Sequence, residues 1–341
     1  MIQFVGVHLG IDEARAASMG RDLQLWETSS SRLVNARRRE DSGITEVPAA
    51  EWIRSGCFCL QDVYLKLPVA ARKVWGLGLS GALGWIALDT AFEPLGPIRL
   101  TADVPVVADI QSWFDANPRA RKRTQMILSA KDYFRFAVSG GLATDVTTAS
   151  RFGLLAPGTT QWASEAIQAA SLDPSWLPPI FDSEAPTGRL SAEGVTQTRL
   201  PAGLWVVAGA CETEASLLAG GDLRAATLWA HRSPENSLLL GYGLSHLNAA
   251  APPPGWSLQR SALAGHQVLT RQLQLAAGDG MPESGPDLGP HERALQEAGF
   301  TTTEARHTHG RPELGAALLA AIGSKLIRRW ESFYKAPKRE S

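Results

Sequence analysis

A carboxylate that directly follows a short apolar strand and a small-residue turn is the most chemically suggestive feature of the sequence. The strand is expected at 205–208, Gly209 and Ala210 form the turn, and Glu212 starts a helix of small residues. In this order of elements an α/β enzyme presents a general base at the mouth of a cleft, and a helix N-terminus favours a charged carboxylate by up to about 1 kcal/mol. Alternatively, Glu212 caps the helix without a catalytic role. Glu214 is expected to face solvent.

Three further patterns could suggest cofactors, but each has a simpler explanation. Residues 76–81 fit the dinucleotide pattern G-x-G-x-x-G, yet a strand should follow instead of a helix, so we reject a Rossmann fold. Cys57-Phe-Cys59 has no second cysteine pair, and we expect these residues at alternate positions of a strand with one or both thiols buried. His307-Thr-His309 and His291 have no identifiable third zinc ligand and are expected in an exposed loop. We therefore assign no metal site.

The overall composition narrows the class of protein. The chain has 341 residues, a formal net charge of −1 and three cysteines. This length allows two domains with separate cores, and the cysteines are too few for a disulfide framework. The charge gives no reason to expect a nucleic-acid or membrane-surface partner. No signal peptide and no apolar stretch of roughly 18 residues is recognisable, so we predict a cytoplasmic protein.

Short apolar runs alternate with helix-like segments, which indicates an α/β architecture. Ser139-Gly140-Gly141 is a helix stop signal, and Asp145 is expected to cap the next helix. The expected strands are 2–7, 73–80 and 84–89, the expected helices are 132–138, the segment after 145, 161–172 and the segment from 313, and a hairpin is expected at 225–229 and 237–242.

Four segments match the motifs of one enzyme family in the same order along the chain. The most specific match joins Lys131-Asp132-Tyr133, Gly141-Leu-Ala-Thr-Asp145 and Ala149-Ser150, which follow the pattern KDYL…TGE.ATD.S.AS. The other matches are a strand, Ser-Gly turn and strand, the segment around Glu212, and a closing GAALLA helix, at 76–94, 206–221 and 314–320. Through these residues the chain resembles the FGGY carbohydrate kinase family.

The resemblance implies an α/β, actin-like (ribonuclease H-like) ATPase fold in which two domains close on ATP, Mg²⁺ and a sugar. It implies a sugar-kinase domain at 1–224 and a shortened, truncated actin-like domain at 225–341. It also implies a role for several site residues. Glu212 is implied as the catalytic base, at the position where the family has an Asp. Sugar binding is assigned to Asp103, Ser80 and Gly81, and cofactor binding to Gly10 and Gly209.

Several chemical groups of the family are replaced in this chain. His8 stands where the family has the first acid of its D.GT motif, and Ile11 stands where it has the Thr. Ala82 replaces a sugar-binding Gln, and 229–231 (Trp-Ala-His) replaces a Gly-Thr-Ser phosphate turn. An imidazole is a poor substitute for a carboxylate beside Mg²⁺, and no adenosine-binding Gly-Gly turn is recognisable. We therefore expect weak or absent binding of ATP and Mg²⁺.

Three functional hypotheses follow. The first is a degenerate carbohydrate-kinase homologue, a pseudokinase with weak or no phosphate transfer that binds a small sugar, a polyol or a partner. The second is an active ATP-dependent sugar kinase with Glu212 as general base. The third is a structural or interaction module with a closed cleft, for which a homodimer is one arrangement.

Overall fold

A seven-stranded mixed sheet with the N-terminal strand near its centre organises the fold. The computed structural model describes residues 1–101, 104–156, 159–220 and 311–325, and the backbone of five strands between 227 and 308. The strand order is β12 (Pro186–Arg189), β13 (Trp205–Val207), β6 (Lys73–Gly81), β1 (Ile2–Leu9), β2 (Glu13–Gly20) and β3 (Leu25–Arg32), with β14 (Ala210–Cys211) also paired to β6. β1 is parallel to β6 and antiparallel to β2. Val5 and Val74 therefore lie in one sheet.

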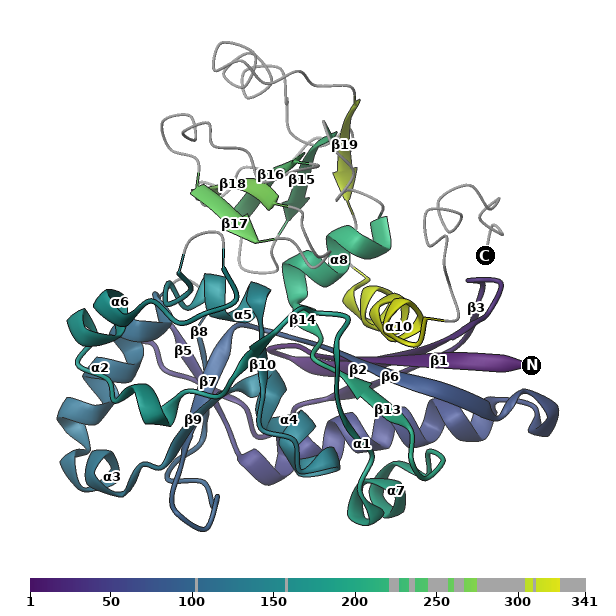
Figure 1. Ribbon diagram of the computed structural model, residues 1–341, viewed down its shortest axis with the longest axis horizontal. Coiled ribbons are helices and arrows are strands. Elements are labelled where there is room, and N and C mark those ends of the chain that lie inside the picture. The colour runs from purple at the N-terminus through teal and green to yellow at the C-terminus, as the bar shows by residue number, and fades with distance from the viewer. Residues whose placement is uncertain are drawn as a thin grey trace.

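Helices cover both faces of this sheet (Figure 1). One face carries α8 (Glu212–Gly220) and α10 (Pro312–Gly323), and the other carries α1 (Ala49–Lys66), α4 (Ala130–Ser139) and α7 (Ala192–Thr198). Coverage on both sides explains why seven of the eight residues of β1 are buried, as is usual for strands in the parallel part of a sheet. Phe4 packs with the α8–α10 side, whereas Val5 and Val7 pack with the α1 side.

Glycines allow α10 to approach the sheet at backbone distance. A Cβ added to Gly78 would lie 1.7 Å from the carbonyl oxygen of Ala316, and one added to Gly6 would lie 2.1 Å from that of Glu313. On the helix itself, a Cβ on Gly315 would lie 1.8 Å from the carbonyl oxygen of Ala215 in α8. The boundary at 224/225 stays a prediction, although α10, which follows it, packs on the sheet that β1 and β6 form.

A second sheet and a set of short helices extend the first part of the chain. The sheet has the order β4 (Arg37–Arg38), β5 (Ile44–Val47), β8 (Ile98–Thr101), β7 (Gly84–Leu88) and β9 (Met126–Ser129). The helices of this part are α2 (Val106–Ala116), α3 (Pro118–Arg123), α5 (Val146–Arg151) and α6 (Ser164–Ala169). It also contains the strand pair β10 (Thr144–Asp145) and β11 (Ile180–Phe181), and the 3₁₀ turns Val69–Ala71 and Pro174–Trp176. Trp85 is buried here against Phe114. The helix stop at Gly140, which has a φ of 72°, and the cap at Asp145 are confirmed.

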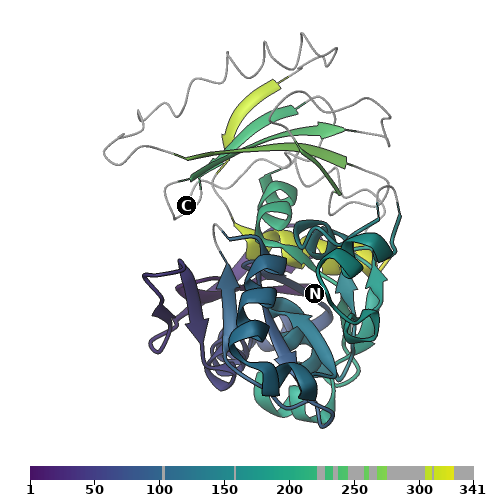
Figure 2. The ribbon, with the colours of Figure 1, turned by 90° about the vertical axis from the view of Figure 1, so that its left-hand side faces the viewer.

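A third sheet follows α8 in the chain. Its order is β17 (Ser257–Arg260), β18 (Gln267–Gln274), β16 (Ser237–Leu244), β15 (Thr227–Arg232) and β19 (Glu304–Thr308). It lies beyond α8 and α10 as seen from the first sheet (Figure 2). The expected hairpin is confirmed, because β15 and β16 pair antiparallel.

Three local expectations were wrong. Cys57 and Cys59 lie in α1, where the buried positions recur with a helical period, and all three cysteines are free and buried. His307 lies in β19 and not in a loop, because that segment pairs with β15, whereas His291 and His309 lie outside the described residues. The helix expected at 161–172 is limited to α6, since a turn at Ser171, with a φ of 52°, ends it. Among the described residues, no helix has both the length and the apolar character to cross a membrane.

Replacing Gly78 by Ala should destabilise the fold by about 3 kcal/mol or more, because the new methyl group would collide with the backbone of α10 and overpacked cores lose stability. Gly188→Ala is the matched control, since its Cβ would meet nothing closer than 3.6 Å. Urea unfolding measures the stability of both variants. Equal midpoints for the two variants would contradict the close packing of α10.

Candidate functional site

The candidate site lies where the carboxyl ends of β1 and β6 meet the start of α8. His8 is the register partner of Ser80, and Ala210 pairs with Ser80 from the other side of β6. Glu212 begins α8 directly after this pairing, as predicted from the sequence. The fold therefore brings His8, Ser80 and Glu212 together from three segments that are far apart in the chain.

The ring of His8 lies between Ser80 and Glu212. Its Nδ1 is 3.4 Å from the hydroxyl oxygen of Ser80, and its Nε2 is 3.6 Å from Oε1 of Glu212. His8 is 1% exposed and Ser80 is fully buried, whereas the side chain of Glu212 is 29% exposed. Burial, with a smaller effect of the Arg15 charge, holds the pKa of His8 well below its usual value. The imidazole is therefore neutral at pH 7, and the carboxylate is the group that solvent reaches.

The two glycines expected to bind the cofactor also lie where an added side chain would collide with neighbouring atoms. Gly209 has a φ of 84°, and a Cβ there would lie 2.3 Å from the carbonyl oxygen of Leu79. A Cβ on Gly10 would lie 2.9 Å from the carbonyl oxygen of Glu13 and 3.0 Å from Nε2 of His8. Packing alone accounts for both glycines, so their proposed role at a nucleotide stays a prediction.

A buried network of charges supports the turn before Glu212. Lys131 donates to the carbonyl oxygen of Ala208 at 2.9 Å, and Arg135 donates to the same oxygen at 3.0 Å. Lys131 also contacts carboxylate oxygens of Asp132 at 2.5 Å and of Asp145 at 3.0 Å. All four charged side chains are 2% exposed or less. The sequence motif around Lys131 was recognised, but only the fold reveals that it holds the turn at 208.

Asp145 connects this network to the turn that follows β13. Its carboxylate accepts hydrogen bonds from the backbone N–H groups of Thr147 and Thr148, which caps α5. The hydroxyl oxygen of Thr147 in turn accepts the N–H of Cys211 at 2.9 Å. The residue that precedes Glu212 is thus fixed by a hydrogen bond from α5.

Glu214 is not a solvent-facing residue, contrary to the sequence-based expectation. It is 2% exposed, and its Oε1 accepts hydrogen bonds from Nε and Nη2 of Arg151 at 3.1 and 2.9 Å. Although burial works against the charged form, the carboxylate of Glu214 keeps the pKa of Arg151 above its usual value. The pair joins α5 to α8. Because α8 packs on α10 on one side and reaches Arg151 of α5 through Glu214, its polar residues are not confined to an outer face.

The remaining predicted site residues have different outcomes. Ser80 and Gly81 end β6 beside His8, and a Cβ on Gly81 would lie 3.0 Å from the Cβ of Lys131. Asp103 lies outside the described residues. The segment 229–231 forms part of β15, and its side chains are outside the described part of the chain. The roles proposed for these residues in sugar and phosphate binding stay predictions.

The groups at the end of β1 do not fit a magnesium ion. Mg²⁺ requires oxygen ligands in near-octahedral geometry, whereas the described residues at this place offer the imidazole of His8, the hydroxyl of Ser80 and the carboxylate of Glu212. No group of three or more His, Cys, Asp or Glu residues that could hold a metal ion occurs among the described residues. We therefore derive no step through Mg²⁺ from these side chains.

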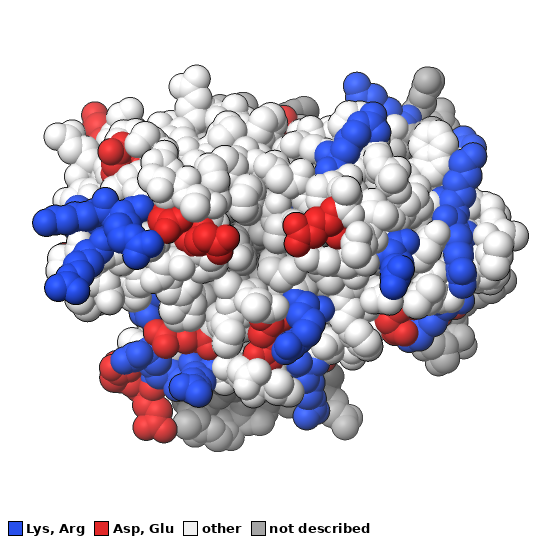
Figure 3. Space-filling view, turned by 90° about the horizontal axis from the view of Figure 1, so that it is seen from below, with Lys and Arg blue, Asp and Glu red and all other residues white. Residues whose placement is uncertain are grey.

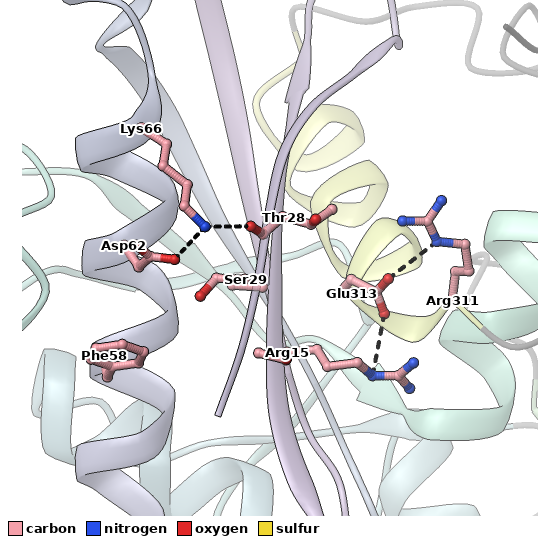
Figure 4. A pocket seen from close by; sticks show the side chains of 10 residues that line it. Arg15, Thr28, Ser29, Phe58, Asp62, Lys66, Arg311 and Glu313 are labelled. Carbon is pink, nitrogen blue, oxygen red and sulfur yellow. Dashed lines mark hydrogen bonds and ion pairs between the residues drawn. The ribbon is translucent and has the colours of Figure 1, made fainter. Parts of the chain in front are cut away.

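A separate cavity of about 580 Å³ lies around the edge strand β3 (Figure 4). Glu313 is positioned between two arginines, with 3.3 Å from its Oε1 to Nε of Arg311 and 3.8 Å from its Oε2 to Nε of Arg15. On the α1 side, Lys66 donates to the backbone oxygen of Thr28 and contacts Asp62 at 2.6 Å. Lys66 thereby covers one polar group of a sheet edge, as edge strands commonly require.

The molecular face in Figure 3 carries charges of both signs. Lysines and arginines lie next to aspartates and glutamates in small clusters, and neither sign covers a continuous area of that face. The expectation of no nucleic-acid partner stays a prediction.

Lys131→Met should lower the free energy of unfolding by about 3–5 kcal/mol, because it leaves two buried carboxylates without their shared cation. Although burial works to raise the pKa of Asp132, Lys131 and Arg135 hold it below the usual value. In the wild type, this carboxylate therefore contributes stability above its unfolded pKa of about 3.9, and the contribution is lost as the pH falls toward the folded pKa.

Urea unfolding of Lys131→Met between pH 4 and 8 checks this prediction. The destabilisation should shrink toward pH 4, where protonation of Asp132 removes a buried charge that Lys131 no longer balances. Lys122→Met, on the exposed helix α3, is the matched control and should change stability by less than about 0.5 kcal/mol. A similar, small loss in both variants would show that the network does not support the fold.

Comparisons with known proteins show similarity to carbohydrate kinases. Residues 107–219 match the family model described as the FGGY family of carbohydrate kinases, N-terminal domain. The chain is 22% identical to a xylulose kinase of Lactococcus lactis over 65% of this chain and 50% of that protein, so it spans about half the length of this relative. It is 23% identical to a xylulose kinase of Klebsiella pneumoniae over 95% of this chain and 77% of that protein.

A solved structure shows the fold. The crystal structure of xylulose kinase from Rhodospirillum rubrum superposes with a TM-score of 0.82 at 15% identity, over 96% of this chain and 92% of that chain. The predicted α/β, actin-like ATPase fold is thereby confirmed. Together with the ordered sequence matches, these findings support the assignment of the chain to the FGGY family of carbohydrate kinases.

Proposed function

We propose that the chain binds a small sugar or polyol on a carbohydrate-kinase scaffold and transfers phosphate from ATP weakly or not at all. One observation carries this proposal. At the end of β1, where the family has an acid, the chain buries a neutral imidazole against Ser80 and Glu212. Phosphoryl transfer depends mainly on positioning and on neutralising the phosphate charges, and this ring offers Mg²⁺ no carboxylate oxygen.

The described residues around Glu212 favour the binding of a sugar over the binding of phosphate. Glu212 presents a partly exposed carboxylate at the start of α8, beside Ser80 and Gly81. A carboxylate accepts hydrogen bonds from hydroxyl groups, which every sugar and polyol offers. Because two relatives are named xylulose kinases, we choose xylulose and xylitol as the ligands to test. Asp103 belongs to the same proposal.

A second candidate function is an active sugar kinase, which the exposure of Glu212 at a helix start favours. In this reaction the carboxylate takes the proton of a sugar hydroxyl, the sugar oxygen bonds to the γ-phosphorus of ATP, and the bond from that phosphorus to the bridging oxygen breaks to release ADP. Relative to Asp, the extra methylene of Glu212 moves the carboxylate by about 1 Å, a displacement that can cost roughly 100-fold in rate.

Xylulose or xylitol should raise the thermal midpoint of the full chain, whereas ATP with Mg²⁺ alone should not. A ligand at 100 times its dissociation constant stabilises a protein by about 2.7 kcal/mol, which differential scanning fluorimetry detects. Calorimetry then gives the two affinities. A micromolar dissociation constant for ATP with Mg²⁺ would refute the proposed loss of phosphate transfer, and no stabilisation by either sugar would refute sugar binding.

The wild type, Glu212→Gln and Glu212→Asp should all show background ADP release with xylulose in a coupled assay. If the second candidate function is correct, Glu212→Gln abolishes turnover and Glu212→Asp raises it, because Asp restores the shorter reach of the family's base. Glu193→Asp, on the exposed side of α7, is the matched control for the Glu-to-Asp change. Measurable turnover of Glu212→Asp above that control would show that the protein can transfer phosphate.

A further inference from the structure

The contacts of His8 connect three side chains in a row, from Ser80 through His8 to Glu212. The side chains of His8 and Ser80 point to the same face because they are register partners of parallel strands. Ser80 is fully buried, His8 is 1% exposed and the side chain of Glu212 is 29% exposed. This row of side chains therefore runs from the core to the surface, and Glu212 is its outer member.

A neutral imidazole has one donor and one acceptor nitrogen, and its neighbours decide which is which. An ionised carboxylate only accepts hydrogen bonds, whereas a serine hydroxyl can donate or accept. The arrangement that satisfies all three groups has the proton of His8 on Nε2, toward Glu212, and the hydroxyl of Ser80 donating to Nδ1. The 3.6 Å between Nε2 and Oε1 is longer than a formed hydrogen bond, and such contacts in ligand-free sites commonly tighten when a ligand binds.

We propose that His8, held by Ser80, is the positioning residue of the ligand-binding carboxylate: its Nε2–H orients Glu212 to accept a hydroxyl group of a sugar or polyol. This inference rests on the proposed sugar-binding role of Glu212. It gives the imidazole at the end of β1 a function of its own, as a neutral donor fixed in one tautomer, instead of a lost acidic group.

The tautomer can be measured directly on the full-length wild type with ¹⁵N-labelled histidine. Two-bond ¹H–¹⁵N correlation spectra at pH 7 should show one neutral ring with its proton on Nε2, identified by its absence in His8→Gln. Ser80→Ala should leave a mixture of tautomers in this ring. A His8 ring that is charged, or that carries its proton on Nδ1, would overturn the proposal.

Two substitutions separate positioning from packing. The amide nitrogen of Gln lies as many bonds from Cα as Nε2 of histidine, whereas that of Asn matches Nδ1. His8→Gln should therefore bind xylulose within about threefold of the wild type, and His8→Asn should bind about tenfold more weakly, as expected for a lost hydrogen bond to a charged group. Equal affinities of the two variants, or weaker binding by His8→Gln, would overturn the inference.

Urea unfolding of both variants confirms that folded proteins are compared. If the wild type binds neither xylulose nor xylitol, the proposed function fails, while the histidine spectrum of the wild type still decides whether His8 donates to Glu212.

Discussion

The backbone oxygen of Ala208 is held by two buried cations, and the position of Glu212 depends on this interaction. Lys131 and Arg135 both donate to that oxygen from α4, and the carboxylates of Asp132 and Asp145 balance their charge. In a low-dielectric interior such a network is strong when complete and costly when one partner is missing. Because Asp145 also caps α5, the same charges fix the turn from two helices before α8 begins.

The close packing of α10 is the second constraint on the site. Gly6 and Gly78 let the helix backbone rest directly on β1 and β6, and Gly315 lets it meet α8 in the same way. The strands that carry His8 and Ser80 are thus clamped between α10 and the α1 side of the sheet. A well-packed interior transmits small displacements, so the packing of α10 on these strands and on α8 helps to set the spacing of His8 and Glu212.

These constraints connect the carbohydrate-kinase fold of the chain to its proposed chemistry. The scaffold of a carbohydrate kinase is retained, with its strand ends, turn and helix start in place. At the end of β1, a buried ring contacts Ser80 and Glu212. The proposed function requires that a rigid scaffold keep a site open to hydroxyl ligands while its phosphate-binding groups change, which is feasible because the two functions depend on separate side chains.

The sequence by itself determined many of the local elements and revealed the resemblance to FGGY carbohydrate kinases. The helix after Lys131, the stop at Gly140, the cap at Asp145 and the hairpin that starts at β15 follow from short-range patterns, because caps, turns and periodicity involve residues a few positions apart. Only the tertiary structure decided that Glu214 pairs with Arg151 and that His8 faces Glu212. Those contacts join residues that are distant in the chain, and their geometry depends on strand register and helix packing, which no local pattern encodes.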